Sequence, residues 1–171
     1  MAKRKRQKRL QRRTLLIIGE GHTETAFLKH IKDLYCRKHQ GPKVKILNAH
    51  GKGPEHILKT AIRNKSVAEF DTTLIVLDTD VAWPPGFKKE ANKCDIYIIG
   101  FTPCIEALFL ELINVRPIPQ DTHKCKEKVQ QELQCDLTKR AGYAQWCTNE
   151  ALQRGTHTNK SLCKLLNYYR I

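Results

Sequence analysis

Acidic side chains follow three of the four apolar, strand-like segments of this sequence. They are Glu20, Asp78, Asp80 and Glu106. The carboxyl ends of parallel strands meet at one edge of a sheet, and open α/β sheets bind their ligands at that edge. We therefore expect these acids to share one site.

The closest pair, Asp78 and Asp80, has a spacing that suits metal binding. In an extended backbone both carboxylates lie on the same side and Thr79 points away. Two carboxylates so placed repel each other, and a hard divalent cation relieves that repulsion. Mg²⁺ prefers oxygen ligands and usually takes one or two carboxylates together with water and substrate phosphate. For the pair alone, acids that merely form turns or cap helices are an equally good interpretation.

The elements that must position these acids alternate between strand and helix. The strand-like segments are 14–19, 43–49, 72–77 and 95–101. The apolar residues that follow the first strand fall at helical spacing from Glu24 onward, with Thr23 as a candidate N-cap, and a second helix covers 55–65. Pro103 suits the start of another helix. The alternation predicts a Rossmann-like α/β fold with a mostly parallel, four-stranded or slightly larger sheet that helices flank.

We divide the chain into three parts. Residues 1–13 form a basic arm that we expect to be disordered, 14–115 the α/β core, and 116–171 a helical C-terminal extension packed on the core. The predicted helices of the extension are His123–Cys135, Lys139–Gln153 and Lys160–Tyr169. About 50 residues would be marginal as a separate domain.

The distribution of charge favours a polyphosphate partner. The net charge is +14, and eight of the 31 basic residues lie in the arm: Lys3, Arg4, Lys5, Arg6, Lys8, Arg9, Arg12 and Arg13. Without them, 23 basic residues face 17 acidic ones, which leaves +6. Such an arm attracts DNA or RNA by displacing condensed counterions. A solvated tail or an address signal is the alternative.

Other residues are weaker candidates for contacts with nucleic acid. His22 and Lys52 are placed to meet phosphate, although surface placement of His22 and an ordinary turn at Lys52 explain them as well. The aromatic rings of Trp83, Phe87 and Trp146 could stack on bases.

Composition excludes several other classes of protein. No stretch approaches the ~18 apolar residues of a membrane helix, and the N-terminus is too polar for a secretory signal. The seven cysteines are odd in number and form no CxxC pair, so we expect free thiols rather than disulfides or zinc ligands. These features predict a cytoplasmic protein with no membrane partner.

The motifs around the acids resemble those of a known family. Ile17–Gly21, then Thr23-Glu24 and Leu77–Asp80, are similar to the Toprim domain of topoisomerases, primases and overcoming-lysogenization-defect nucleases. The segment Thr102–Leu110 resembles the Pro-Cys-x-Glu segment of the RloB-like branch, which is often found with phage-defence genes. The resemblance covers residues 14–115.

The resemblance implies a metal-dependent nuclease or related phosphodiesterase. Glu20 would be the general acid/base or a metal ligand, Asp78 and Asp80 would hold Mg²⁺ or Mn²⁺, and Glu106 would complete the cluster. A partner ATPase or another protein of a defence complex is implied as well. No acid follows Asp80 until Glu90, which disfavours a two-metal site.

Two other functions stay open beside the nuclease. One is a non-catalytic nucleic-acid-binding subunit of a larger complex, which would rely on its basic surface. The other is nucleotidyl transfer of the primase type, which the lack of accessory domains disfavours.

Overall fold

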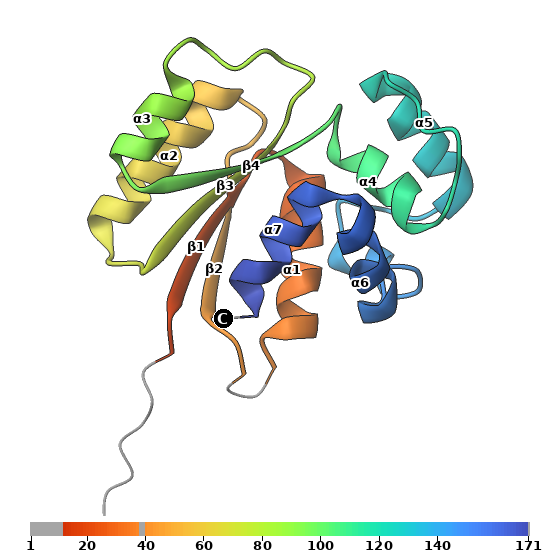
Figure 1. Cartoon of the computed structure of the whole chain (residues 1–171), viewed down its shortest axis with the longest axis horizontal. Helices are drawn as coiled ribbons and strands as arrows, with labels where there is room; N and C mark the ends of the chain where they lie inside the picture. The colour runs from red at the N-terminus through yellow and green to blue at the C-terminus, as the bar shows by residue number, and fades with distance from the viewer. Residues whose placement is uncertain (1–11, 38–39, 171) are drawn as a thin grey trace, which may run out of the picture.

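The sheet has four parallel strands in the order β2-β1-β3-β4. The structure, a computed structural model, describes residues 12–37 and 40–170. Its strands are β1 (Thr14–Gly19), β2 (Lys43–Asn48), β3 (Thr72–Asp78) and β4 (Ile96–Phe101) (Figure 1). The predicted fold class is therefore confirmed.

The two central strands are apolar on both faces. In β1, Leu15 and Ile17 face one core and Leu16 and Ile18 the other, and all four are at most 2% exposed. Alternate side chains of a strand point to opposite faces, so a continuous apolar run requires cover on both sides. The register places Ile17 beside Ile46 of β2 and Leu74 of β3.

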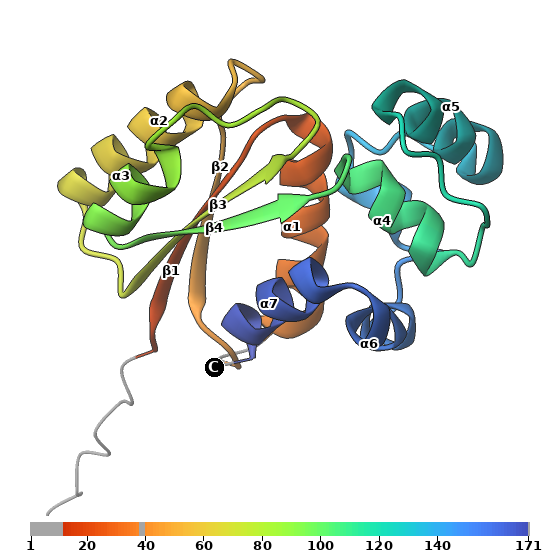
Figure 2. The same cartoon turned by 45° about the horizontal axis from the view of Figure 1, so that its top comes forward.

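Helices provide that cover in two layers. On one face lie α2 (Pro54–Val67) and α3 (Phe87–Lys93), and on the other α1 (His22–Tyr35) and α7 (Lys160–Tyr169) (Figure 2). The α2 face buries Ile57, Leu58 and Ala61 against the sheet.

The remaining helices extend the larger core beyond α1. They are α4 (Ile105–Leu112), α5 (Thr122–Leu133), the 3₁₀ helix η1 (Arg140–Tyr143) and α6 (Asn149–Thr158). Val129 of α5 and Leu152 of α6 belong to the same buried cluster as Leu15 of β1. The buried hydroxyl of Tyr169 donates to the carbonyl of Leu28 at 3.1 Å. The C-terminal extension is thus packed on the core.

Four local predictions need correction. Gly21, not Thr23, is the N-cap of α1, and α4 begins at Ile105, after Pro103. The predicted helix Lys139–Gln153 is instead η1 and the start of α6, with Thr148 capping the latter through Ala151 N–H. The helix α3 follows the Trp83–Gly86 loop and was not predicted.

The basic arm falls largely outside the described residues, which include only Arg12 and Arg13 of its eight cationic side chains. Arg12 has a structural role, since its guanidinium donates to the carbonyls of Gln40, Gly41 and Pro42 at 2.8–3.1 Å. None of the helices in the described ranges combines the length and apolar character that a membrane crossing requires.

Because the sheet and the C-terminal helices share one core, the chain should unfold in one step. Leu165→Ala on α7, a fully buried position, should lower the free energy of unfolding by about 2–5 kcal/mol in urea titrations. Asn167→Ala, exposed on the same helix, serves as the control. Two separate transitions by fluorescence and circular dichroism would show that the extension folds independently.

Candidate active site at the carboxyl edge of the sheet

The carboxyl ends of β1 and β3 form the topological switch point of the sheet. After β1 the chain passes through α1 to β2 on one side, whereas after β3 it passes through α3 to β4 on the other. The divergent connections leave a crevice between the two strand ends, where α/β proteins bind ligands. Glu20 and Asp78 lie at these two ends.

Backbone hydrogen bonds hold Glu20 between the neighbouring strands. Its N–H donates to Val76 O at 3.0 Å, and its carbonyl accepts from Gly51 N–H at 2.7 Å. Its side chain turns toward β3, where Oε2 accepts from the backbone N–H of Asp78 at 3.1 Å.

A further acid, Glu24, joins this site from the first turn of α1. Its Oε2 accepts from Gly21 N–H at 2.9 Å, and the side chain is only 6% exposed. The first turn of α1 can approach β1 closely because Gly19 has no side chain: a Cβ there would lie 3.0 Å from Thr25 Oγ1. The interpretation of Glu24 as a first-turn helix residue is correct, but its burial among the other acids was not predicted.

The acid that follows the fourth strand, Glu106, lies in the first turn of α4. Asp78 Oδ1 accepts from Ile105 N–H at 2.9 Å, so a side chain of β3 satisfies an N-terminal donor of this helix. The next residue, Glu106, is 6% exposed, and its Oε2 is buried without a hydrogen-bond partner in the described part of the chain. A buried carboxylate oxygen without a donor is costly, and contact with a bound cation would offset that cost.

The proximity of these acids changes the proton affinity of Asp78. Burial raises its pKa to about 8, and the charges of Glu24, Glu106 and Glu20 contribute in the same direction. Burial also raises the pKa of Glu24, although hydrogen bonds from backbone N–H groups oppose the shift. We call Glu20, Glu24, Asp78 and Glu106 the acid cluster.

Asp80 lies outside the acid cluster, contrary to the prediction. The strand ends at Asp78, so the extended geometry that would align the two carboxylates does not continue. Asp80 is exposed and its Oδ1 accepts from Val81 N–H at 2.8 Å. The largest charges acting on Asp78 come from the other acids of the cluster.

The acid cluster fits a hard cation only with help from other ligands. Within the described ranges no three His, Cys, Asp or Glu side chains are grouped as a ready metal site. Mg²⁺, however, commonly takes one or two carboxylates and fills its remaining positions with water and phosphate. The carboxylate oxygens of Asp78, and Oε2 of Glu106, which has no hydrogen-bond partner in the described part of the chain, are ligands of the kind that Mg²⁺ takes.

Lys126, on α5, lies close enough to the acid cluster for the acids to change its pKa. Partial burial acts to lower that pKa, but the negative charges of Glu106 and Asp78 outweigh the effect, so the pKa of Lys126 is raised. His22 lines a cavity of about 530 Å³ with His50, Lys29 and Arg140. Lys52 is exposed in the turn before α2. It lines neither the cavity at His22 nor the cavity that Thr79 lines.

All seven cysteines lie in the described ranges, and none of them is paired in a disulfide. Three of them, Cys104, Cys125 and Cys147, are buried. Burial raises the pKa of the Cys147 thiol to about 12, which makes it a poor nucleophile.

Comparison with known proteins yields no match: no family model, no curated protein and no solved structure is similar to this chain. The inferences about the site therefore rest on its geometry.

Sequence patterns missed Glu24 and Lys126 for different reasons. Glu24 could have been found from Gly21 three residues earlier, because that spacing lets a first-turn carboxylate fold back on the N-cap. Lys126 carries no local signal, since only the packing of α5 against α4 brings it near the acids.

The raised pKa of Asp78 predicts how stability depends on pH without divalent metal. Between its ordinary value of 3.8 and about 8, the folded protein holds a proton that the unfolded chain releases, so stability falls as pH rises through this range. Asp78→Asn keeps an acceptor for Ile105 N–H but cannot ionise. In EDTA it should stabilise the protein at pH 8.5 by on the order of a few kcal/mol and have little effect at pH 4.

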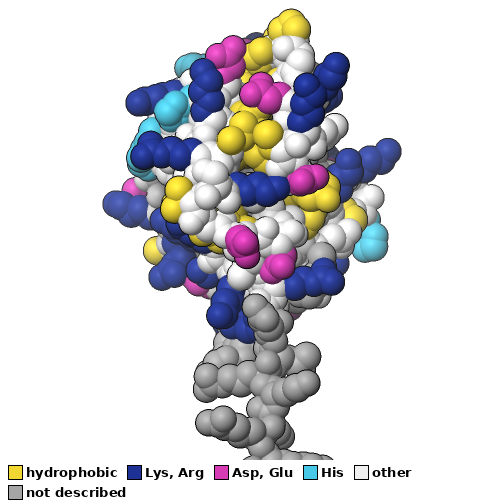
Figure 3. Space-filling model, turned by 90° about the vertical axis from the view of Figure 1, so that its left-hand side faces the viewer, with side chains coloured by type: hydrophobic (Ala, Val, Ile, Leu, Met, Phe, Trp, Pro, Cys, Tyr) yellow, Lys and Arg dark blue, Asp and Glu magenta, His cyan; other side chains and the backbone are white. Residues whose placement is uncertain are grey.

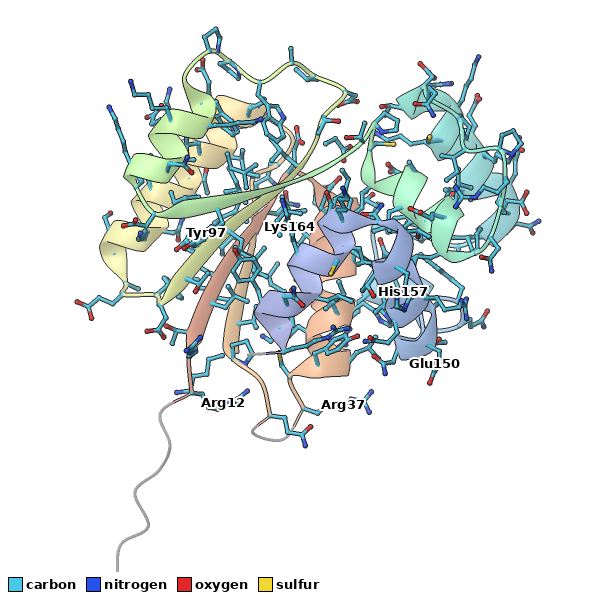
Figure 4. All side chains as sticks on the ribbon, viewed as in Figure 1. Arg12, Arg37, Tyr97, Glu150, His157 and Lys164 are labelled. Carbon is cyan, nitrogen blue, oxygen red and sulfur yellow. The ribbon has the colours of Figure 1, made fainter. Side chains whose placement is uncertain are left out.

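Urea titrations at both pH values measure this difference. Glu150→Gln on α6 removes an exposed acid, labelled in Figure 4, and is the control: hydrogen bonds with the backbone and Thr148 lower the pKa of Glu150, so this change should not stabilise the protein at pH 8.5. An equal effect of Asp78→Asn at both pH values would show that the Asp78 carboxylate is not destabilised by its surroundings.

Proposed function

We propose that the protein is a divalent-metal-dependent phosphodiesterase of Toprim type that cleaves nucleic acid. The observation that carries the proposal is the convergence of four carboxylates at the switch point, where burial and mutual repulsion raise the pKa of Asp78. These acids are buried or partly buried and none of them forms a salt bridge within the described ranges, which costs stability; functional sites are where such costs are retained.

Asp78 and Glu106 are the residues best suited to hold Mg²⁺ or Mn²⁺. Asp78 uses Oδ1 for Ile105 N–H, so Oδ2 would meet the ion, and Glu106 would offer its buried Oε2. When bound, the cation would neutralise charge on the phosphoryl oxygens and lower the pKa of a water nucleophile.

The remaining polar groups divide the other tasks. Glu20 is less buried than Glu24 or Glu106 and is held from both sides by the backbone, so it is suited to accept or return a proton. Glu24 would act as a positioning residue because its carboxylate fixes the turn that bears Glu20. Lys126 and the basic cavity at His22 would contact phosphate.

The nucleic-acid class of the substrate is supported by the charge of the chain. The net charge is +14, and the phosphate backbone is the feature that basic surfaces of either DNA- or RNA-binding proteins recognise. The resemblance to the RloB-like branch is the support for a cytoplasmic role in phage defence beside a partner ATPase.

A non-catalytic nucleic-acid-binding subunit is the second candidate. It is favoured by one observation, the lack of a ready three-ligand metal group among the described residues. In this case the acid cluster would have no catalytic role, and the protein would keep it despite its cost in stability.

A cleavage assay separates the two functions. The purified protein would be incubated with single- and double-stranded DNA and RNA in Mg²⁺, Mn²⁺ or EDTA. Cleavage should require metal and fall about 10²-fold or more in Glu20→Gln and Asp78→Asn, since both remove a carboxylate but keep a hydrogen-bond acceptor. Glu150→Gln should cleave normally. If no substrate is cut and both variants bind nucleic acid as the wild type does, the binding subunit is the better description.

Metal binding can be tested without activity. Mg²⁺ or Mn²⁺ should raise the melting temperature of the protein, because a ligand that binds only the folded state stabilises it. Asp78→Asn and Glu106→Gln should reduce that rise severalfold, and Asp80→Asn should retain most of it. Should Asp80→Asn lose as much as Asp78→Asn, the ion is bound by the Asp-x-Asp pair and not by the acid cluster.

A further inference from the structure

Two cavities lie side by side next to the acid cluster, and Trp83 and Lys88 line both. The first, of about 690 Å³, extends from Thr79 along the loop to Lys89. The second, of about 500 Å³, continues over β4 to Tyr97, Lys164 and Tyr168. We call these two adjacent cavities together the Trp83 groove. It begins at Thr79, the residue that follows Asp78.

Trp83 is fixed to the central acid of the site. Its Nε1–H donates to the backbone carbonyl of Asp78 at 3.2 Å. The indole can lie against β4 only because Gly100 has no side chain: a Cβ there would lie 2.9 Å from Cζ2 of the indole. The ring is therefore a rigid wall of the groove that begins at the site of chemistry.

Aromatic rings lie on both sides of the edge strand β4. On the α3 side the Phe87 ring, which is buried, lies 5.5 Å from the indole, and on the α7 side Tyr97 and Tyr168 pair at 5.7 Å between centroids. Tyr97 is 53% exposed, which is unusual for a large ring on a strand and leaves it available to a ligand. Figure 3 shows hydrophobic side chains on the face of α2 and α3, with lysine, arginine and acidic side chains around them.

The charge along the groove has one sign. No Asp or Glu lines either cavity, whereas Lys88, Lys89 and Lys164 do. None of these three lysines forms an ion pair with a carboxylate in the described part of the chain. The Lys88 ammonium lies 5.2 Å from the Trp83 ring, and Figure 4 shows Tyr97 and Lys164 on neighbouring elements, β4 and α7.

We propose that the Trp83 groove binds an unpaired, single-stranded segment of nucleic acid and leads it to the acid cluster. Aromatic rings interleaved with free lysines are what single-strand binding requires, because bases stack on the rings and phosphates meet the ammonium groups. In a duplex the faces of the bases are covered by their neighbours, so these rings would have nothing to stack on. The inference rests on the proposed function for the identity of the substrate, and it adds the strandedness.

Fluorescence anisotropy in EDTA tests binding without cleavage. A fluorescein-labelled oligo(dT) of about 12 nucleotides and a hairpin duplex of similar length are the probes. Oligo(dT) should bind more tightly than the duplex. Tyr97→Ala and the double variant Lys88→Gln/Lys164→Gln should each weaken oligo(dT) binding about 10-fold. All three side chains are exposed, so the variants should fold.

Matched controls lie away from the groove. Lys43→Gln removes an exposed lysine at the amino end of the sheet, and Val67→Ala trims an apolar side chain that is 81% exposed. Both should bind oligo(dT) as the wild type does.

A second readout reports on the groove directly. The chain has two tryptophans, so Trp146→Phe leaves Trp83 as the sole indole. Oligo(dT) should quench its emission, and Tyr97→Ala should shift the quenching to higher oligonucleotide concentration.

The outcomes for the groove and for the nuclease are distinguishable. Tighter binding of the duplex, unchanged oligo(dT) binding in the groove variants, or no quenching would overturn the groove inference even if the protein cleaves nucleic acid. Sensitivity of binding to the groove variants supports the inference even if no substrate is cut.

Discussion

Four carboxylates, of which Glu24 and Glu106 are buried, gather beside two helix N-termini, and the other features of the site follow from this arrangement. Glu24 accepts from a backbone N–H at the start of α1, and Asp78 accepts from one at the start of α4. Helix N-termini carry partial positive charge and unpaired donors, so they lower the cost of placing negative charge between them. The compensation is incomplete, because Oε2 of Glu106 is buried without a hydrogen-bond partner in the described part of the chain.

The topology of the sheet makes this arrangement available. Since β1 lies between β2 and β3, the strands that bear Glu20 and Asp78 are neighbours although 58 residues separate the two acids. The α4 helix must then begin beside Asp78, and it is held there by the helices of the C-terminal extension, which share its core. The extension is therefore a structural part of the site and not an appendage to it.

The acid cluster and the Trp83 groove are joined at one residue. Asp78 presents its carboxylate to α4 and its backbone carbonyl to Trp83, so the proposed chemistry and the proposed substrate path meet at the end of β3. The two surfaces differ in charge, acidic at the strand ends and basic along β4 and α3. This separation suits a substrate whose phosphates are attracted along the groove and meet the acids only where a cation would neutralise them.

Local patterns in the sequence were enough to predict the parallel sheet and the edge at which the acids gather. Short runs of branched apolar residues such as Thr14–Gly19 fit strands that are buried on both faces, and an acid after such a strand lies at the carboxyl edge. Which acids meet depends on the tertiary structure. Asp80 lies outside the cluster because β3 ends two residues before it. Glu24 belongs to the cluster because Gly21 is the N-cap of α1, which places Glu24 in the first turn of the helix. The positions of Lys126 and Trp83 depend on contacts between segments that are distant in sequence. Local sequence patterns carry no signal for such contacts.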